Sequence, residues 1–209
     1  ETIRARADAY ESLLRHGFVC LLNVPVKKAG AYQLRVAVRD TTSERIGSAS
    51  QFIEIPDIKK NRLMLSGLII SGSDRAKAAT ANIEPGADET ADQAVDPQAN
   101  AVMRRFKRGM VLLYDYLIFD ARLDKAMSRP QLETQVRLFR DGQPIFTGSP
   151  KPFDAGNQAD FKRLIAGGAI QLGTDMTPGE YVLQIVVTDA LSKGKHRTAA
   201  QWIDFEIAQ

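Results

Sequence analysis

The chain has 209 residues, 44% hydrophobic and 25% charged, so it can build a core and lacks the composition of a disordered, collagen-like or coiled-coil sequence. Its 28 basic and 25 acidic residues give a net charge of +3. The basic residues are spread along the chain, whereas nucleic-acid-binding proteins usually gather them on one face. We therefore expect no nucleic-acid partner. No apolar run approaches the roughly 20 residues that a membrane-spanning helix needs.

An internal repeat is the strongest feature of the sequence. Residues 30–40 match residues 179–189, with Gly, Tyr, Leu, Val and Asp recurring at the same spacing. Residues 49–53 and 199–203 then match after a single-residue gap. The match also extends upstream, where Tyr10, Leu13, Leu14, Gly17, Val19 and Leu21 correspond to Phe161, Leu164, Ile165, Gly168, Ile170 and Leu172.

The upstream part of each copy predicts a short helix. Apolar residues at i, i+3 and i+4, followed by a glycine, are typical of one or two helical turns with a glycine after the last turn. In the first copy, Asp8 and Glu11 have the spacing of a capping box, which marks a helix start. Each copy is therefore expected to begin with a short helix and to continue in strands.

The strands of the repeat alternate with period two. In the second copy the residues of one face are apolar, and burying each would contribute roughly 1.5–3 kcal/mol. These residues are Tyr181, Leu183, Ile185 and Val187. In the first copy the opposite face is polar, as expected for the solvated face of an antiparallel sheet, and consists of Gln33, Arg35, Ala37 and Arg39.

Each copy also places a tyrosine two residues after its glycine, Tyr32 and Tyr181. This spacing favours a corner tyrosine, whose hydroxyl bonds back to nearby backbone as in immunoglobulin-like sandwiches. A core tyrosine with its hydroxyl at the rim is the alternative.

The remaining strands are expected after a short polar connection at residues 56–61. They are predicted at residues 62–71, 110–120, 132–140 and 144–148. Asp141 and Gly142 between two of these strands tolerate the positive φ of a tight hairpin. With three strands from the repeat this makes seven. The fold expected is thus all-β, with residues 57–209 forming a complete immunoglobulin- or fibronectin-like antiparallel sandwich.

Residues 73–100 interrupt this pattern with an alanine-rich, acidic segment. Loops of that length are usually functional or disordered, and we expect this one to be mobile. Its carboxylates could bind calcium, although the EF-hand pattern is absent, so a solvated loop is the preferred interpretation. The basic run at residues 104–108 follows. A charged strand edge is the preferred interpretation there, with an anionic partner or docking on the acidic segment as alternatives.

Residues that could carry catalysis are few. Neither His16 nor His196 has a partner at triad spacing, and Asp115, Asp120 and Asp124 alternate with apolar residues as at a solvent-facing strand edge. The single cysteine, Cys20, lies in an apolar run and is expected to be buried. Clustered Cys and His and phosphate-binding glycine loops are absent from the sequence. We expect no enzyme, no cofactor and no metal site.

Four segments together resemble a known family. Residues 24–40, 52–57, 132–142 and 201–205 are similar to the C-terminal half of bacterial von Willebrand factor A-related domain proteins. The resemblance implies an exported protein whose A-type domain lies upstream, and hence an extracytoplasmic location. The metal-binding Asp-x-Ser-x-Ser motif of the A-type domain is absent from this sequence, so the resemblance carries no metal site over.

The repeat also predicts the domain organisation. The second copy has about 100 residues ahead of the matched part, whereas the first has only residues 1–9, and the chain opens with Glu1 and no signal peptide. We therefore expect residues 1–56 to be the trailing part of a truncated sandwich. Its apolar face should be covered by the second domain, by self-association or by a partner chain.

The function expected is a non-catalytic structural or interaction module that binds a protein partner or its own upstream A-type domain. A carbohydrate-binding accessory domain of a secreted enzyme is the alternative. Trp202 is the only tryptophan, and its alternation with Gln201 and Ile203 predicts a buried core residue. A buried Trp202 argues against the carbohydrate alternative, which would need exposed aromatic rings.

Overall fold

The computed structural model describes residues 22–55, 57, 62–73, 96, 98–194 and 196–208. All regular secondary structure in this part of the chain is β-strand, so the all-β prediction is confirmed. The contacts divide it into a hairpin unit, Leu21–Asn61, and a sandwich unit that begins at Arg62. No helix within the described ranges is long and apolar enough to cross a membrane.

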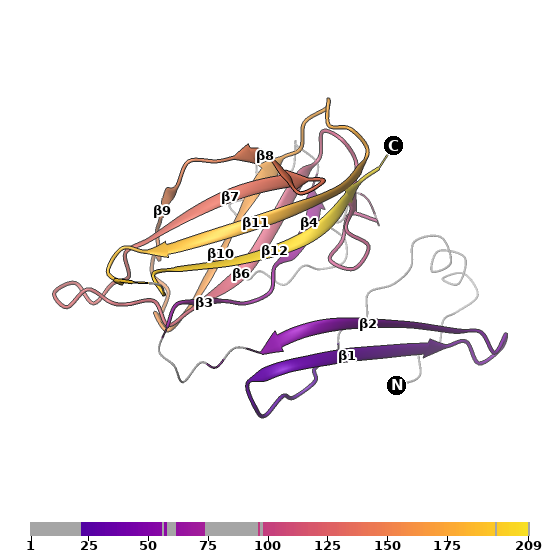
Figure 1. Ribbon diagram of the computed structural model, residues 1–209, viewed down its shortest axis with the longest axis horizontal. Coiled ribbons are helices and arrows are strands. Elements are labelled where there is room, and N and C mark those ends of the chain that lie inside the picture. The colour runs from indigo at the N-terminus through magenta and orange to yellow at the C-terminus, as the bar shows by residue number, and fades with distance from the viewer. Residues whose placement is uncertain are drawn as a thin grey trace. The chain divides into compact units, whose positions relative to one another are not determined.

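The hairpin unit consists of β1 (Gly30–Arg39) and β2 (Ile46–Ile55), which pair antiparallel with Tyr32 opposite Ile53 (Figure 1). At the turn, the Asp40 carboxylate accepts hydrogen bonds from the Ser43 hydroxyl and from the Thr42 backbone N–H. These bonds stabilise the charged form and hold the Asp40 pKa below its usual value. The loop after β1 is therefore ordered by a local side-chain cap.

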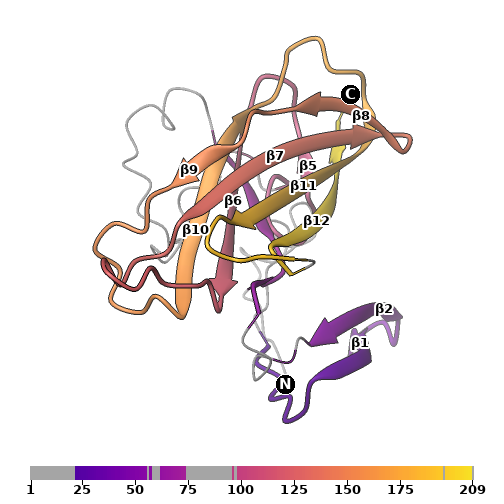
Figure 2. The same cartoon turned by 60° about the vertical axis from the view of Figure 1, so that its left-hand side comes forward.

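The sandwich unit contains two sheets that face each other (Figures 1 and 2). One sheet has the order β10-β6-β3, with β4 also pairing with β6. The other has the order β5-β12-β11-β7-β8, with β9 also pairing with β7. The strand bounds are β3 (Met64–Leu65), β4 (Ile69–Ser73), β5 (Arg105–Phe106), β6 (Val111–Phe119), β7 (Leu132–Arg140), β8 (Gln143–Thr147), β9 (Lys151–Phe153), β10 (Arg163–Gln171), β11 (Gly179–Asp189) and β12 (Thr198–Ile207).

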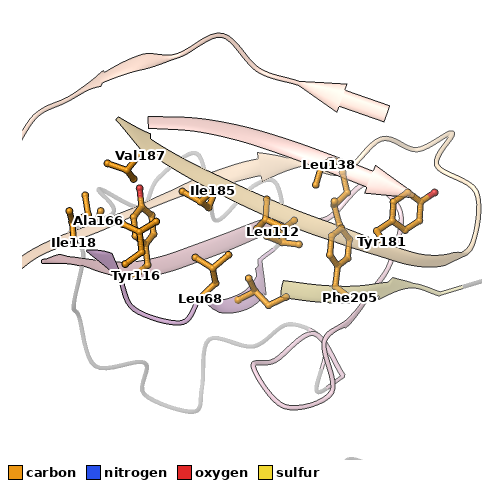
Figure 3. Close-up of a cluster of buried hydrophobic side chains, with 14 of the residues drawn as sticks. Leu68, Leu112, Tyr116, Ile118, Leu138, Ala166, Tyr181, Ile185, Val187 and Phe205 are labelled. Atoms are coloured by element: carbon orange, nitrogen blue, oxygen red, sulfur yellow. The ribbon is translucent and has the colours of Figure 1, made fainter. Parts of the chain in front are cut away.

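The core fills the space between the two sheets (Figure 3). From β11, Leu183, Ile185 and Val187 are fully buried, as the period-two pattern predicts. They face apolar residues of β6 and β10, among them Leu112 and Leu164. Phe205 of β12 stacks on Tyr181 at a centroid distance of 5.7 Å and meets Phe106 edge-on at 5.8 Å.

The corner tyrosines are confirmed in both copies. The Tyr181 hydroxyl donates to the Thr177 carbonyl at 2.6 Å, and the Tyr32 hydroxyl donates to the Lys28 carbonyl at 2.7 Å. The glycine ahead of each tyrosine also has the same role, because φ is 146° at Gly30 and 135° at Gly179. Side chains rarely tolerate such angles, which explains why glycine recurs there.

The hairpin at Asp141 and Gly142 is confirmed too, with φ of 50° and 75°. The strand predicted at residues 62–71 is instead broken into β3 and β4. Between them, Ser66 bonds to Leu117 through its backbone N–H and its hydroxyl, which replaces regular ladder pairing. The sandwich unit has ten strands where seven were predicted, because the short strands β3, β5 and β9 carry too few residues to show a period.

The helix predicted in the second copy is wrong. Residues 163–171 form β10, with Leu164 and Ala166 buried between the sheets. Gly167 and Gly168 allow β6 to approach, since a Cβ on Gly167 would lie 2.7 Å from the Tyr114 carbonyl oxygen. Pairing with β6 thus overrides the helical spacing. The matching helix predicted in the first copy lies outside the described residues, as do Cys20 and His16.

Candidate ligand-binding groove

Trp202 is not a core residue, and this prediction is wrong. Its side chain is 64% exposed, whereas Phe205 on the same strand is 3% exposed. The register explains the difference, since the buried Leu183 lies opposite Ile203 and Tyr181 opposite Phe205. Odd-numbered residues of β12 therefore face the core, and Trp202 falls on the outer face of the six-stranded sheet.

Trp202 lies beside a groove of about 410 Å³ on this outer face. Its cross-strand neighbours are Gln184 on β11 and, one strand further, Arg137 on β7. The next row of the sheet contains Asp204, Val182 and Phe139. The groove is lined by side chains from three adjacent strands and from the β7–β8 turn, including Phe139, Arg140, Glu180, Val182, Gln184, Trp202 and Asp204.

A buried polar atom in the groove lacks a partner. Gln184 Oε1 is buried without a hydrogen bond to any described residue. The nearest guanidinium in its row, that of Arg137, donates instead to Gln135 Oε1 at 2.7 and 3.1 Å. An acceptor left in this state is unfavourable by roughly 1–3 kcal/mol. The groove therefore contains an acceptor that a ligand donor could satisfy.

The Arg140 guanidinium forms one wall of the groove. It lies over the Tyr181 ring at 5.4 Å and donates to the Tyr181 hydroxyl and to the Pro178 carbonyl, both at 3.4 Å. Its Nε also lies 3.5 Å from Asp141 Oδ2. These contacts fix the guanidinium beside the groove with its charge only partly neutralised.

A second hollow, of about 560 Å³, opens between the two sheets beside β7, β8 and β10. Most of its lining is apolar, and Val136, Leu138, Ile170 and Met176 also belong to the core or pack against it. Burial and the nearby Asp115 carboxylate raise the pKa of Tyr114, which lines one side. We interpret this hollow as the open end of the sandwich core.

The basic run at residues 104–108 is confirmed as a strand edge. It contains β5, the outermost strand of the six-stranded sheet, which pairs with β12 in parallel. Arg104 pairs with Asp204 at 3.0 Å, Arg105 with Glu206 at 3.2 Å and Lys107 with Asp96 at 2.8 Å. The last of these pairs is the docking on the acidic segment that the sequence offered as an alternative. Most of that segment lies outside the described residues, including Asp88, Glu89 and Asp92.

The described residues bring together no catalytic or metal-binding set. Within them, no group of three or more His, Cys, Asp or Glu side chains could hold a metal ion. His196 is exposed in the loop between β11 and β12. Asp120 lies 3.7 Å from the Lys162 ammonium, and Asp124 accepts bonds from the backbone of Met127 and Ala126, which lowers its pKa. These aspartates shape loops at strand ends.

Comparison with known proteins adds little. No protein family and no curated protein matches the chain. A solved structure described as a "putative bacterial DNA binding protein" from Bacteroides vulgatus ATCC 8482 aligns with 96% of this chain and 76% of its own, with 11% identity and a TM-score of 0.24. A match at that TM-score carries no argument about what this chain binds.

The expectation of no nucleic-acid partner is nevertheless corrected by this finding, because the matched structure is described as DNA-binding. The expectation rested only on the spread of basic residues along the sequence. That spread does not determine how charges are arranged on the folded surface. The exclusion of nucleic acid is withdrawn.

Proposed function

We propose that this chain is a non-catalytic binding module whose ligand is a carbohydrate, held in the groove beside Trp202. The observation that carries the proposal is the exposed indole of Trp202 next to the unpaired Gln184 Oε1. The argument against this function was a buried Trp202, and the register removes it.

The chemistry of the groove suits a sugar. Trp202, Val182 and Phe139 offer an apolar surface to the C–H face of a pyranose ring, since aromatic rings combine a large contact area with little flexibility. Around them, Arg140, Glu180 and Asp204 provide charged donors and acceptors for hydroxyl groups. A volume of about 410 Å³ falls within the range of roughly 300–1,000 Å³ that is usual for small-ligand sites.

Trp202 is itself the reporter for the test, because it is the only tryptophan in the chain. Titration with soluble xylan, β-glucan, α-glucan and chitin oligosaccharides should change its emission with at least one polymer. Trp202→Ala should abolish retention on that polymer without changing the unfolding transition. Phe146→Ala is the matched control, since it removes an exposed aromatic ring from β8 on the other hollow. Unchanged emission with every polymer would contradict the proposal.

A protein partner is the second candidate, and the composition of the groove favours it. Trp and Arg are the residues most enriched at energetic hot spots of protein interfaces, and Trp202 and Arg140 line the same groove. This candidate keeps the structural or interaction role, and the extracytoplasmic location, that the resemblance implies. An upstream A-type domain added to the chain should then change Trp202 emission where the glycans do not.

A further inference from the structure

The two hairpins of the repeat differ in what covers their apolar faces. On β11, Leu183 and Ile185 are 0% exposed; on β1, the equivalent Leu34 and Val36 are 36% and 40% exposed. The residues themselves are nearly the same, and each glycine and tyrosine has the same geometry in both copies. The sequence of β1 therefore has the apolar face of a core strand, and that face is open.

The sandwich unit shows what such a face packs against. Ile185 and Val187 of β11 point at side chains of the opposite sheet, including Leu112 from β6 and Ala166 from β10 (Figure 3). The free edge of β11 is also paired, with β7 from Asp189 opposite Leu132 to Val182 opposite Phe139. A hairpin of this sequence type is thus completed by one facing sheet and one edge strand.

Within the described residues, β1 has neither. It pairs only with β2, so its other edge carries unpaired backbone groups along ten residues. An isolated two-stranded hairpin is marginally stable in water. Both the open face and the open edge point to strands that are missing from this hairpin.

We propose that β1–β2 is the closing hairpin of a second sandwich of the kind formed by the sandwich unit. Its occupant is a sheet of the β4–β6–β10 type with an edge strand of the β7 type, supplied by the same polypeptide ahead of the hairpin. In the second copy, residues 64–178 precede β11 and provide these strands. Only 29 residues precede Gly30 in this sequence, enough for one strand of the set.

The experiment compares this chain with one lengthened by the roughly 100 residues that precede it in its gene product, a length taken from the second copy. Hydrogen exchange of peptides from β1 and β2 is the readout. Exchange should be fast in the 209-residue chain and about 100-fold slower in the lengthened chain, because a covered strand exchanges only through larger unfolding events.

A matched pair of variants tests which face is covered. In the lengthened chain, Val36→Asp should abolish the protection, whereas Ala37→Asp, the next residue on the opposite face, should preserve it. Equal exchange in the two chains would overturn the proposal. Protection that appears in the 209-residue chain as its concentration rises would also overturn it, since a second copy would then be the occupant.

Discussion

The hairpins β1–β2 and β11–β12 carry the same residues in different surroundings. Both begin at a glycine with positive φ, both fasten a tyrosine hydroxyl to the carbonyl four residues earlier, and both end β1 or β11 near an aspartate that caps the next loop. Asp189 is buried and also accepts from the Arg122 backbone of another loop, whereas Asp40 bonds only within its own turn. Local structure is therefore encoded in the repeat, and burial is not.

The largest contrast should come from the core-facing apolar residues. Ile185→Ala should reduce the free energy of unfolding by about 2–5 kcal/mol, because it leaves a cavity between the sheets. Val36→Ala, at the equivalent exposed position, should change the exchange of β1 amides very little. Urea unfolding followed by Trp202 emission measures the first, and hydrogen exchange the second. A similar loss of protection for Val36→Ala would mean that β1 is already covered.

A smaller contrast is expected between glycines of the two units. Gly167→Ala should destabilise the sandwich unit by about 1–3 kcal/mol, since its Cβ would lie 2.7 Å from the Tyr114 carbonyl oxygen, which is backbone and cannot easily move. Gly47→Ala in β2 meets no atom within 4 Å. Its effect on hairpin exchange should be neutral or slightly protective. A neutral Gly167→Ala would contradict the close approach of β6 and β10.

The corner tyrosines should show a contrast near the limit of measurement. Tyr181→Phe removes a buried hydroxyl bonded to Thr177 and to Arg140, and should destabilise the sandwich unit by about 1 kcal/mol. Tyr32→Phe removes an exposed bond to Lys28, for which water can substitute, so the hairpin should be nearly unaffected. Equal effects would show that the corner acts only through its local bond.

The sequence predicted the strands whose periodicity is long, and it failed where pairing decides. Residues 132–140 and the Asp141–Gly142 turn were placed correctly because alternation and turn chemistry agree. Residues 163–171 were placed wrongly, because spacing of i, i+3 and i+4 fits a helix while pairing with β6 requires a strand. The alignment of β2 with β12 also shifts by two residues, since Ile53 and Phe205 occupy equivalent positions opposite the two tyrosines.

The candidate groove was missed for a related reason. Trp202 was assigned to the core from its size and from apolar neighbours, although alternation allows only one of Trp202 and Ile203 to point inward. The signal that could have placed it was the parity with Phe205 and Ile207, both buried. The unpaired Gln184 Oε1 has no counterpart in the sequence pattern, since it depends on Arg137 bonding elsewhere.

The smallest effect is expected where the two hairpins agree, on the outer aromatic residue of the second strand. Phe52 is 69% exposed and Trp202 is 64% exposed, and each lies directly opposite a glutamine, Gln33 or Gln184. Trp202→Ala should therefore change the free energy of unfolding by less than about 0.5 kcal/mol, as surface substitutions usually do. Phe205→Ala, three residues along the same strand, should reduce it by about 3–5 kcal/mol because its ring is buried against Tyr181. Both are measured by urea unfolding followed by circular dichroism, since Trp202→Ala removes the fluorophore. A loss for Trp202→Ala as large as that for Phe205→Ala would return Trp202 to the core and would remove the groove as a ligand site.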